Sequence, residues 1–140
     1  MAWTVDTCVL VDIIEDDPEF GTHSARCIAK HLRDGLVLSP VSFVELGPTF
    51  NGNILELRKF LNGCGIQYNV PFDTRDAEIG HKIWNDCIVA KRKKIEAKRP
   101  VADVLIGAFA MKTQGLITRN PKDFRKKFPN LEVINPKPPE

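Results

Sequence analysis

The stretch Trp3-Thr4-Val5-Asp6-Thr7-Cys8-Val9-Leu10 joins a short run typical of a strand to an acidic residue at its end. An Asp or Glu side chain is almost never buried in a protein unless it is paired or bound to a metal ion. The same pattern recurs at Glu45 and at Asp103, which both lie within otherwise apolar segments. Three isolated acids of this kind predict one shared cation. Because all the donors are oxygens, we expect Mg²⁺ or Mn²⁺.

The rest of the composition limits the class of protein. The chain has 140 residues, 43% of them hydrophobic, which is enough for one domain with its own core. Its four cysteines and three histidines show neither a Cys-x-x-Cys pair nor zinc-ligand spacing, so we expect reduced thiols and no zinc site. No run of eighteen uncharged apolar residues occurs, which predicts a soluble, cytoplasmic protein. We expect one domain over residues 1–135 and a loose proline-rich tail over residues 136–140.

Short apolar strands alternate with helical segments along the whole chain. Strands are expected at residues 3–5, 36–39, 116–118 and 131–134. Helices are expected at residues 9–14, 18–34, 53–62 and 74–88, around Glu45, from about 101 to 114, and from about 120. In the helix over 18–34, the apolar face should contain Ala25, Ile28, Ala29 and Leu32, and Thr74 should cap the long helix. This alternation predicts an α/β fold with a parallel sheet, helices on both faces, and a ligand site at the carboxyl edge.

The charges are unevenly distributed along the chain. Residues 1–70 carry 5 Lys and Arg against 9 Asp and Glu, whereas residues 71–140 carry 15 against 9. The basic residues of the second half gather in two groups, one over residues 91–99 and one over residues 119–127. Either group alone is typical of a solvated helix face. Two such groups around an acidic segment also agree with a polyphosphate partner such as a nucleic acid.

Four motifs in order carry a family resemblance. Val5-Asp6-Thr7-Cys8-Val9-Leu10 resembles the opening of a PIN domain, and Ser42-Phe43-Val44-Glu45-Leu46 is similar to its second acidic motif. The third and fourth motifs are matched by residues 103–110 and 118–124. Their order and spacing are similar to those of small VapC-type toxins of toxin–antitoxin pairs. The resemblance implies a three-layer α/β/α PIN-like fold with a parallel sheet of four or five strands. It also implies a metal-dependent ribonuclease that commonly forms a dimer and is neutralised by an antitoxin.

The resemblance assigns roles to particular residues. Asp6, Glu45 and Asp103 match the metal-binding acids of the family, and Asn120 stands where many members have an Asp. Since Asn offers one neutral carbonyl oxygen, a second cation should be held more weakly. Thr7, Thr118 and Asp123 are candidates for orienting the ligands or water. The residues expected to grip RNA phosphates are Lys91, Arg92, Lys93, Lys94, Arg119 and Lys122.

The predicted activity is therefore a Mg²⁺- or Mn²⁺-dependent endoribonuclease, with RNA as substrate, a cognate antitoxin as partner and a homodimer as assembly. Two other functions stay open at this stage. One is a structure-specific DNA nuclease, and the other is a PIN domain that binds RNA or protein without cutting.

The acids also have purely structural interpretations. Asp6 could cap the helix after it, and Glu45 could pair with an arginine. The Asp103 carboxylate could interact with the positive end of its helix dipole. Asn120 and Asp123 could form an N-cap and an N3 acid around Pro121. For Asp12, a solvated helix position is preferred over a place near the site.

Overall fold

A parallel sheet forms the centre of the protein. The computed structural model describes residues 1–92 and 101–137. For residues 91 and 92 it describes the backbone alone. The five strands lie in the order β3-β2-β1-β4-β5, and every neighbouring pair is parallel. They are β1 (Trp3–Val5), β2 (Leu36–Val37), β3 (Ile66–Gln67), β4 (Gly115–Ile117) and β5 (Val133–Ile134). The predicted parallel α/β sheet is confirmed, and β3 is a fifth strand beyond the four that the sequence pattern predicted.

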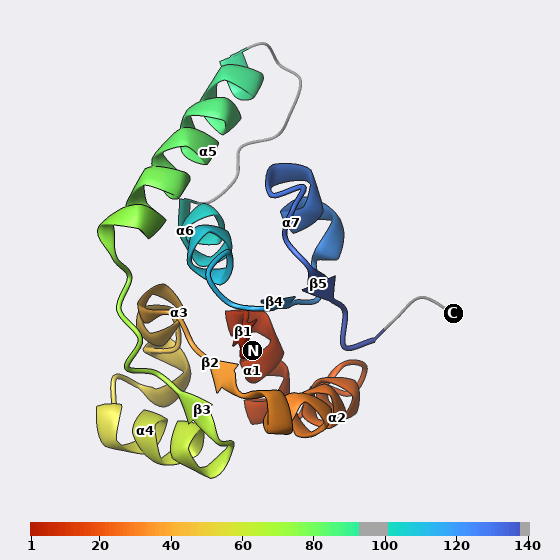
Figure 1. The fold of residues 1–140 in the computed structure, drawn as a ribbon. Coiled ribbons are helices and arrows are strands. Elements are labelled where there is room, and N and C mark those ends of the chain that lie inside the picture. Colours follow the sequence, from red (N-terminus) through yellow and green to blue (C-terminus); the bar gives the residue numbers. More distant parts are fainter. Residues whose placement is uncertain (93–100, 138–140) are drawn as a thin grey trace.

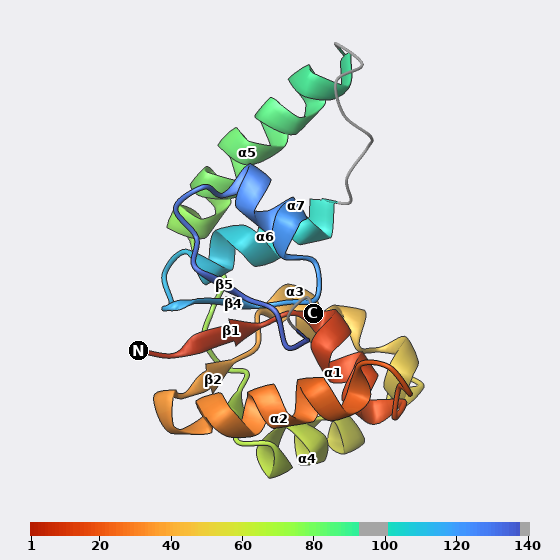
Figure 2. The same cartoon turned by 90° about the vertical axis from the view of Figure 1, so that its right-hand side faces the viewer.

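Helices cover both faces of this sheet (Figures 1 and 2). They are α1 (Thr7–Ile14), α2 (Gly21–His31), α3 (Pro40–Glu45), α4 (Ile54–Gly63), α5 (Thr74–Arg92), α6 (Val101–Ala110) and α7 (Pro121–Lys127), with short 3₁₀ turns at Leu32–Asp34 and Pro48–Phe50. Figure 2 shows α1, α2 and α4 on one side of the sheet and α6 and α7 on the other. Helix α5 packs along α6 and extends past it. Among the described residues, no helix is long and apolar enough to cross a membrane.

The sheet separates two hydrophobic clusters. Successive residues of a strand point to opposite faces, and β4 follows this rule. Leu116 belongs to the cluster under α6 and α7, together with Phe124 and Phe128. Ile117 belongs to the cluster under α1, α2 and α4, which also contains Val9. Both strand residues are fully buried, so the short strand β4 anchors the two layers at once.

Helix α2 differs from the prediction in its bounds and its buried face. The Asp17 carboxylate accepts the backbone N–H groups of Glu19 and Phe20, which holds residues 18–20 in a turn before the helix. The buried residues of α2 are Gly21, Ser24, Cys27 and Ile28, whereas Ala25, Ala29 and Leu32 are exposed. The reason is close packing: a Cβ at Gly21 would lie 3.1 Å from the backbone oxygen of Asp12, so small residues face α1.

Two further expectations are wrong in detail. Helix α5 is capped by a reciprocal pair, in which Asp73 accepts the N–H of Asp76 and Asp76 accepts the N–H of Asp73, and not by Thr74. The tail was expected to be loose, but Pro136 is buried and the Lys137 ammonium lies 3.2 Å from Glu19 Oε1. Residues 138–140 lie outside the described part of the chain.

Candidate active site

Asp6 follows β1 and is a buried carboxylate, with 5% of its surface exposed. It occupies the N-cap position of α1, yet its side chain makes no capping hydrogen bond. Instead, Oδ2 accepts the Thr118 hydroxyl at 2.7 Å and the Cys8 thiol at 3.4 Å. Burial raises the pKa of Asp6, and the hydrogen bonds from Thr118 and Cys8 offset this in part. Within the described residues Asp6 has no cationic partner, so its charge is buried against neutral donors alone.

Glu45 lies at the end of α3 and is exposed. The Thr7 hydroxyl, from the first turn of α1, lies 2.7 Å from Glu45 Oε1 and 2.9 Å from Ser42 Oγ. Helix α3 is fixed beneath this contact by Ser39, whose hydroxyl accepts the N–H of Ser42 at the N-cap. The charge of Glu45 contributes to the raised pKa of Asp6, so the two carboxylates interact electrostatically. No arginine pairs with Glu45 among the described residues.

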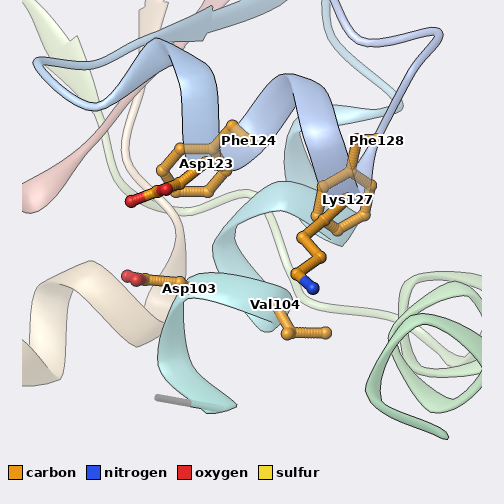
Figure 3. A pocket seen from close by; sticks show the side chains of 6 residues that line it. All are labelled: Asp103, Val104, Asp123, Phe124, Lys127 and Phe128. Carbon is orange, nitrogen blue, oxygen red and sulfur yellow. The ribbon is translucent and has the colours of Figure 1, made fainter. Parts of the chain in front are cut away.

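Asp103 faces Asp123 across a small pocket between α6 and α7 (Figure 3). Asp103 is in the first turn of α6, and Asp123 is in the first turn of α7. Their carboxylates point to the same side, while Lys127 lies toward the other end of the pocket. The volume of about 20 Å³ is enough for one water molecule. Sequence reasoning rated Asp123 below Asn120, because the N3 position of a helix explained the acid without a site.

The close approach of α6 and α7 depends on Gly107. A Cβ at this position would lie within 2.7 Å of Cζ in the Phe128 ring, and other atoms of the ring are also too close. Phe128 is 3% exposed and directly follows the last residue of α7. The absence of a side chain at Gly107 therefore lets α7 lie against α6, which sets the position of Asp123 opposite Asp103.

Asn120 does not line the pocket that contains Asp103. It is an exposed residue at the N-cap of α7, and its side chain makes no capping hydrogen bond. Its backbone N–H donates to the Thr118 hydroxyl oxygen at 3.1 Å. The side chain lines a neighbouring cleft that also includes Asp123 and Lys122. Thr118 thus links the Asp6 carboxylate to the turn that leads into α7.

The candidate acids form two pairs, Asp6 with Glu45 and Asp103 with Asp123. Helix α3 packs against α6, and α6 packs against β1, so the elements that carry the two pairs are neighbours. Over residues 1–92 and 101–137, no group of three or more His, Cys, Asp and Glu residues forms a compact metal site. The chemistry of the donors nevertheless fits a hard cation, because all are carboxylate oxygens and Asp6 lacks a cationic partner.

Asp12 is the acid that sequence reasoning placed wrongly. Its exposed fraction is 3%, so it is not a solvated helix residue. Arg119 Nε lies 2.6 Å from Asp12 Oδ2, and the Arg119 guanidinium stacks over the Phe20 ring at 4.3 Å. Burial raises the pKa of Asp12, while the charge of Arg119 and the hydroxyl of Ser24 lower it. The signal was present, since Asp12 interrupts an apolar run just as Asp6, Glu45 and Asp103 do.

The predicted RNA-binding residues are only partly described. Arg119 is engaged by Asp12 and Phe20, whereas Lys122 is exposed beside Asn120. Lys93 and Lys94 lie outside the described residues, as do the side chains of Lys91 and Arg92.

The comparisons agree with this architecture. No protein-family model matches the chain, and no curated protein matches it. Solved structures match over nearly the full length. A chain of the VapBC2 complex from Rickettsia felis, bound to a promoter DNA fragment, is 19% identical, with a TM-score of 0.69 and coverage of 96% of this chain and 98% of that one. A chain of the DNA-bound VapBC complex from Salmonella typhimurium is 17% identical, with a TM-score of 0.68 and coverage of 98% and 99%.

A third similar structure is FitAcB from Neisseria gonorrhoeae, at 22% identity, a TM-score of 0.66 and coverage of 97% of this chain and 98% of that one. The protein therefore has a three-layer α/β/α PIN-like fold, as predicted. These three solved structures are VapBC and FitAcB structures, and they confirm the fold that the resemblance to VapC-type toxins implies.

Proposed function

We propose that this protein is a metal-dependent endoribonuclease that acts as the toxin of a toxin–antitoxin pair. The observation that carries the proposal is the buried Asp6 carboxylate. Among the described residues its hydrogen-bond donors are neutral, and it lies at the carboxyl edge of a parallel sheet. Ligand sites of open α/β sheets lie outside this edge. A buried charge that lacks a cationic partner is unfavourable, and a bound divalent cation would compensate it.

Asp6, Glu45, Asp103 and Asp123 are the proposed ligands of Mg²⁺ or Mn²⁺. Bound at these acids, the cation would supply an activated water and offset the negative charge that develops on the phosphate. Asp123 takes the place of the amide Asn120 as the fourth site residue in this proposal, because Asp123 shares the pocket with Asp103. Asn120 keeps a role beside the site, through the turn that Thr118 holds.

The neighbouring hydroxyl groups orient the acids. Thr118 donates to Asp6 Oδ2 and so restrains the orientation of that carboxylate. Thr7 does the same for Glu45 from the first turn of α1. Cys8 adds a weak donor on Asp6, because burial and the charge of Asp6 raise the pKa of its thiol to about 12 and keep it protonated. These donors fix the carboxylate positions before substrate binds.

A cognate antitoxin is the proposed protein partner, since the similar solved structures include VapBC and FitAB complexes and a toxin–antitoxin complex from Klebsiella pneumoniae. A homodimer is proposed as the assembly. Exposed apolar side chains offer area for such partners: Val44 on α3 and Leu55 on α4 are each 75% exposed. Co-purification with the product of an adjacent gene, and light scattering of the protein alone, test the two partners separately.

The test of the activity is incubation of the purified protein with total RNA and Mg²⁺ or Mn²⁺, followed by mapping of the fragment ends. We expect discrete cuts that leave a 5′-phosphate and a 3′-hydroxyl, because a water activated by the cation would add to phosphorus while the bond from phosphorus to the 3′-oxygen breaks. EDTA should abolish the cuts. Single-stranded and branched DNA in the same assay test the alternative of a DNA nuclease.

Two variants and a control connect the activity to the site. Asp6→Asn and Asp123→Asn should each reduce cleavage at least about 100-fold, because each removes a ligand charge. Asp34→Asn changes the same residue type at an exposed position of the 3₁₀ turn after α2 and should leave cleavage unchanged. RNA that stays intact with the wild-type protein at millimolar Mn²⁺ would refute the nuclease and leave the RNA- or protein-binding alternative.

A further inference from the structure

Three concavities lie end to end along α7. The pocket of Asp103 and Asp123 is the middle one (Figure 3). Asp123 also lines a cleft of about 660 Å³, here called the Arg125 cleft. Its polar side chains come from the turn before α7, from α7 itself and from the segment after β5. Lys127 also lines a cleft of about 350 Å³ between α7 and α5, here called the Lys82 cleft. Asp123 lines the first two of these concavities, and Lys127 lines the pocket of Asp103 and the Lys82 cleft. The three therefore lie next to one another along α7 and are together called the groove.

Positive side chains flank the acidic middle of this groove on both sides. In the Arg125 cleft, Arg119 is occupied by Asp12 and Lys137 by Glu19. Lys122 and Arg125 are exposed and form no ion pair within the described residues; Arg125 makes one long contact, of 3.4 Å, with the Val133 carbonyl.

The Lys82 cleft has a similar character. Among the described residues, its charged side chains are Lys82, Lys126, Lys127 and Asp86, so cations outnumber acids there as well. Helix α5 contributes Lys82, and the last turn of α7 contributes the other two lysines. Each end of the groove thus has excess positive charge, and the acid pair lies between them.

We propose that a single strand of RNA binds along α7, with phosphates in the Arg125 cleft and in the Lys82 cleft and the scissile phosphate at the Asp103–Asp123 pocket. The position of the scissile phosphate rests on the proposed nuclease function, whereas the phosphate positions in the two clefts do not. A repeating anion fits the charge pattern better than an acidic peptide, because a phosphate over the acids can share their cation.

The lining residues also predict how the strand is recognised. Among the described residues, the lining of neither cleft includes an aromatic side chain, so we expect base stacking to contribute little there. The contacts come from Lys, Arg and Asn side chains, which bind phosphate and sugar without reading sequence. Binding should therefore depend strongly on salt and weakly on base composition.

The experiment measures the binding of a labelled single-stranded RNA of about 12 nucleotides by fluorescence anisotropy, in EDTA, over a range of salt concentrations. The double variant Lys122→Ala/Arg125→Ala removes two cations from one end, and Lys82→Ala/Lys126→Ala removes two from the other. If each side chain neutralises one phosphate, each double variant should reduce the slope of log K against log salt by about 1.4. Arg58→Ala/Lys59→Ala removes two exposed cations from α4, in the opposite layer, and should leave the slope unchanged.

Each result has a defined meaning. An unchanged slope in either groove variant, or an equal reduction in the α4 control, would overturn the proposal that the strand occupies both ends. Tighter binding of DNA of the same sequence would overturn RNA as the ligand. Cleavage with Mn²⁺ is measured in parallel. If the two groove variants show the expected reduction in slope but the wild type cleaves no RNA, the nuclease alone is refuted. If both groove variants still cleave RNA and their slopes are unchanged, the groove alone is refuted.

Discussion

Gly107 offers a way to move the proposed fourth acid without changing any charged residue. In Gly107→Ala, the new methyl group would lie within 2.7 Å of Phe128 Cζ, whereas carbon atoms pack at about 3.5–4.0 Å. The ring, and α7 with it, must therefore retreat by about 1 Å. Overpacking of this kind costs about 1–3 kcal/mol of stability. A misplacement of about 1 Å near a reacting centre can reduce the rate about 100-fold.

The measurements are urea unfolding, Mn²⁺ affinity by calorimetry and RNA cleavage. The control is Gly80→Ala on α5, where the methyl group would lie 3.5 Å from Leu105 Cδ2, an ordinary contact. That variant should be neutral or more stable, since Ala favours a helix interior over Gly by about 1 kcal/mol. The double variant Gly107→Ala/Phe128→Leu relieves the clash and should recover part of the Mn²⁺ affinity. Unchanged Mn²⁺ affinity and cleavage in a destabilised Gly107→Ala protein would show that the distance between Asp103 and Asp123 is irrelevant to the site.

Three further variants test the remaining contacts. Asp6→Asn should raise the melting temperature of the metal-free protein at pH 7, by about 3–5 °C per kcal/mol in a domain of this size. Burial raises the folded-state pKa of Asp6, so the wild type gains stability as the pH falls through that pKa. The difference in melting temperature between variant and wild type should therefore shrink as the pH falls toward 3.8, the ordinary pKa of Asp. A difference that stays constant with pH would contradict a buried, charged Asp6. Arg119→Ala should lower the free energy of unfolding by about 3 kcal/mol, because it leaves the Asp12 carboxylate buried without its cation. Adding Asp12→Asn to this variant should restore most of the lost stability. Equal urea midpoints of the single and double variants would exclude this coupling. Thr118→Val should weaken Mn²⁺ binding about tenfold, whereas Thr118→Ser, which keeps the hydroxyl, should preserve it. Equal Mn²⁺ affinities of the two variants by calorimetry would show that the hydroxyl has no role in the site.

The parts of the site that sequence predicted are those tied to strand ends. Asp6 and Thr118 follow neighbouring parallel strands, so their side chains meet at one edge of the sheet whatever the details of packing. Glu45 and Thr7 meet because α1 and α3 begin at the same edge. Local pattern was sufficient for these four residues, since the strand and helix signals were strong.

The parts that sequence did not predict depend on how helices approach one another. Asp123 faces Asp103 because Gly107 lets α7 lie against α6, and a glycine in an apolar helix does not reveal which ring it accommodates. Asp12 is buried because the Arg119 side chain, far away in the chain, reaches it. The exposed Ala25 and Ala29 of α2 show the same limit: a helical apolar pattern has more than one possible inward face, and the close contact at Gly21 selects another.

The thiol beside Asp6 has a consequence for the chemical resistance of the protein. Oxidants and alkylating agents attack the thiolate, and a pKa of about 12 leaves almost no thiolate on Cys8 at neutral pH. In the metal-free protein, Cys8 therefore places a sulfur atom next to the carboxylate without creating a point of oxidative damage.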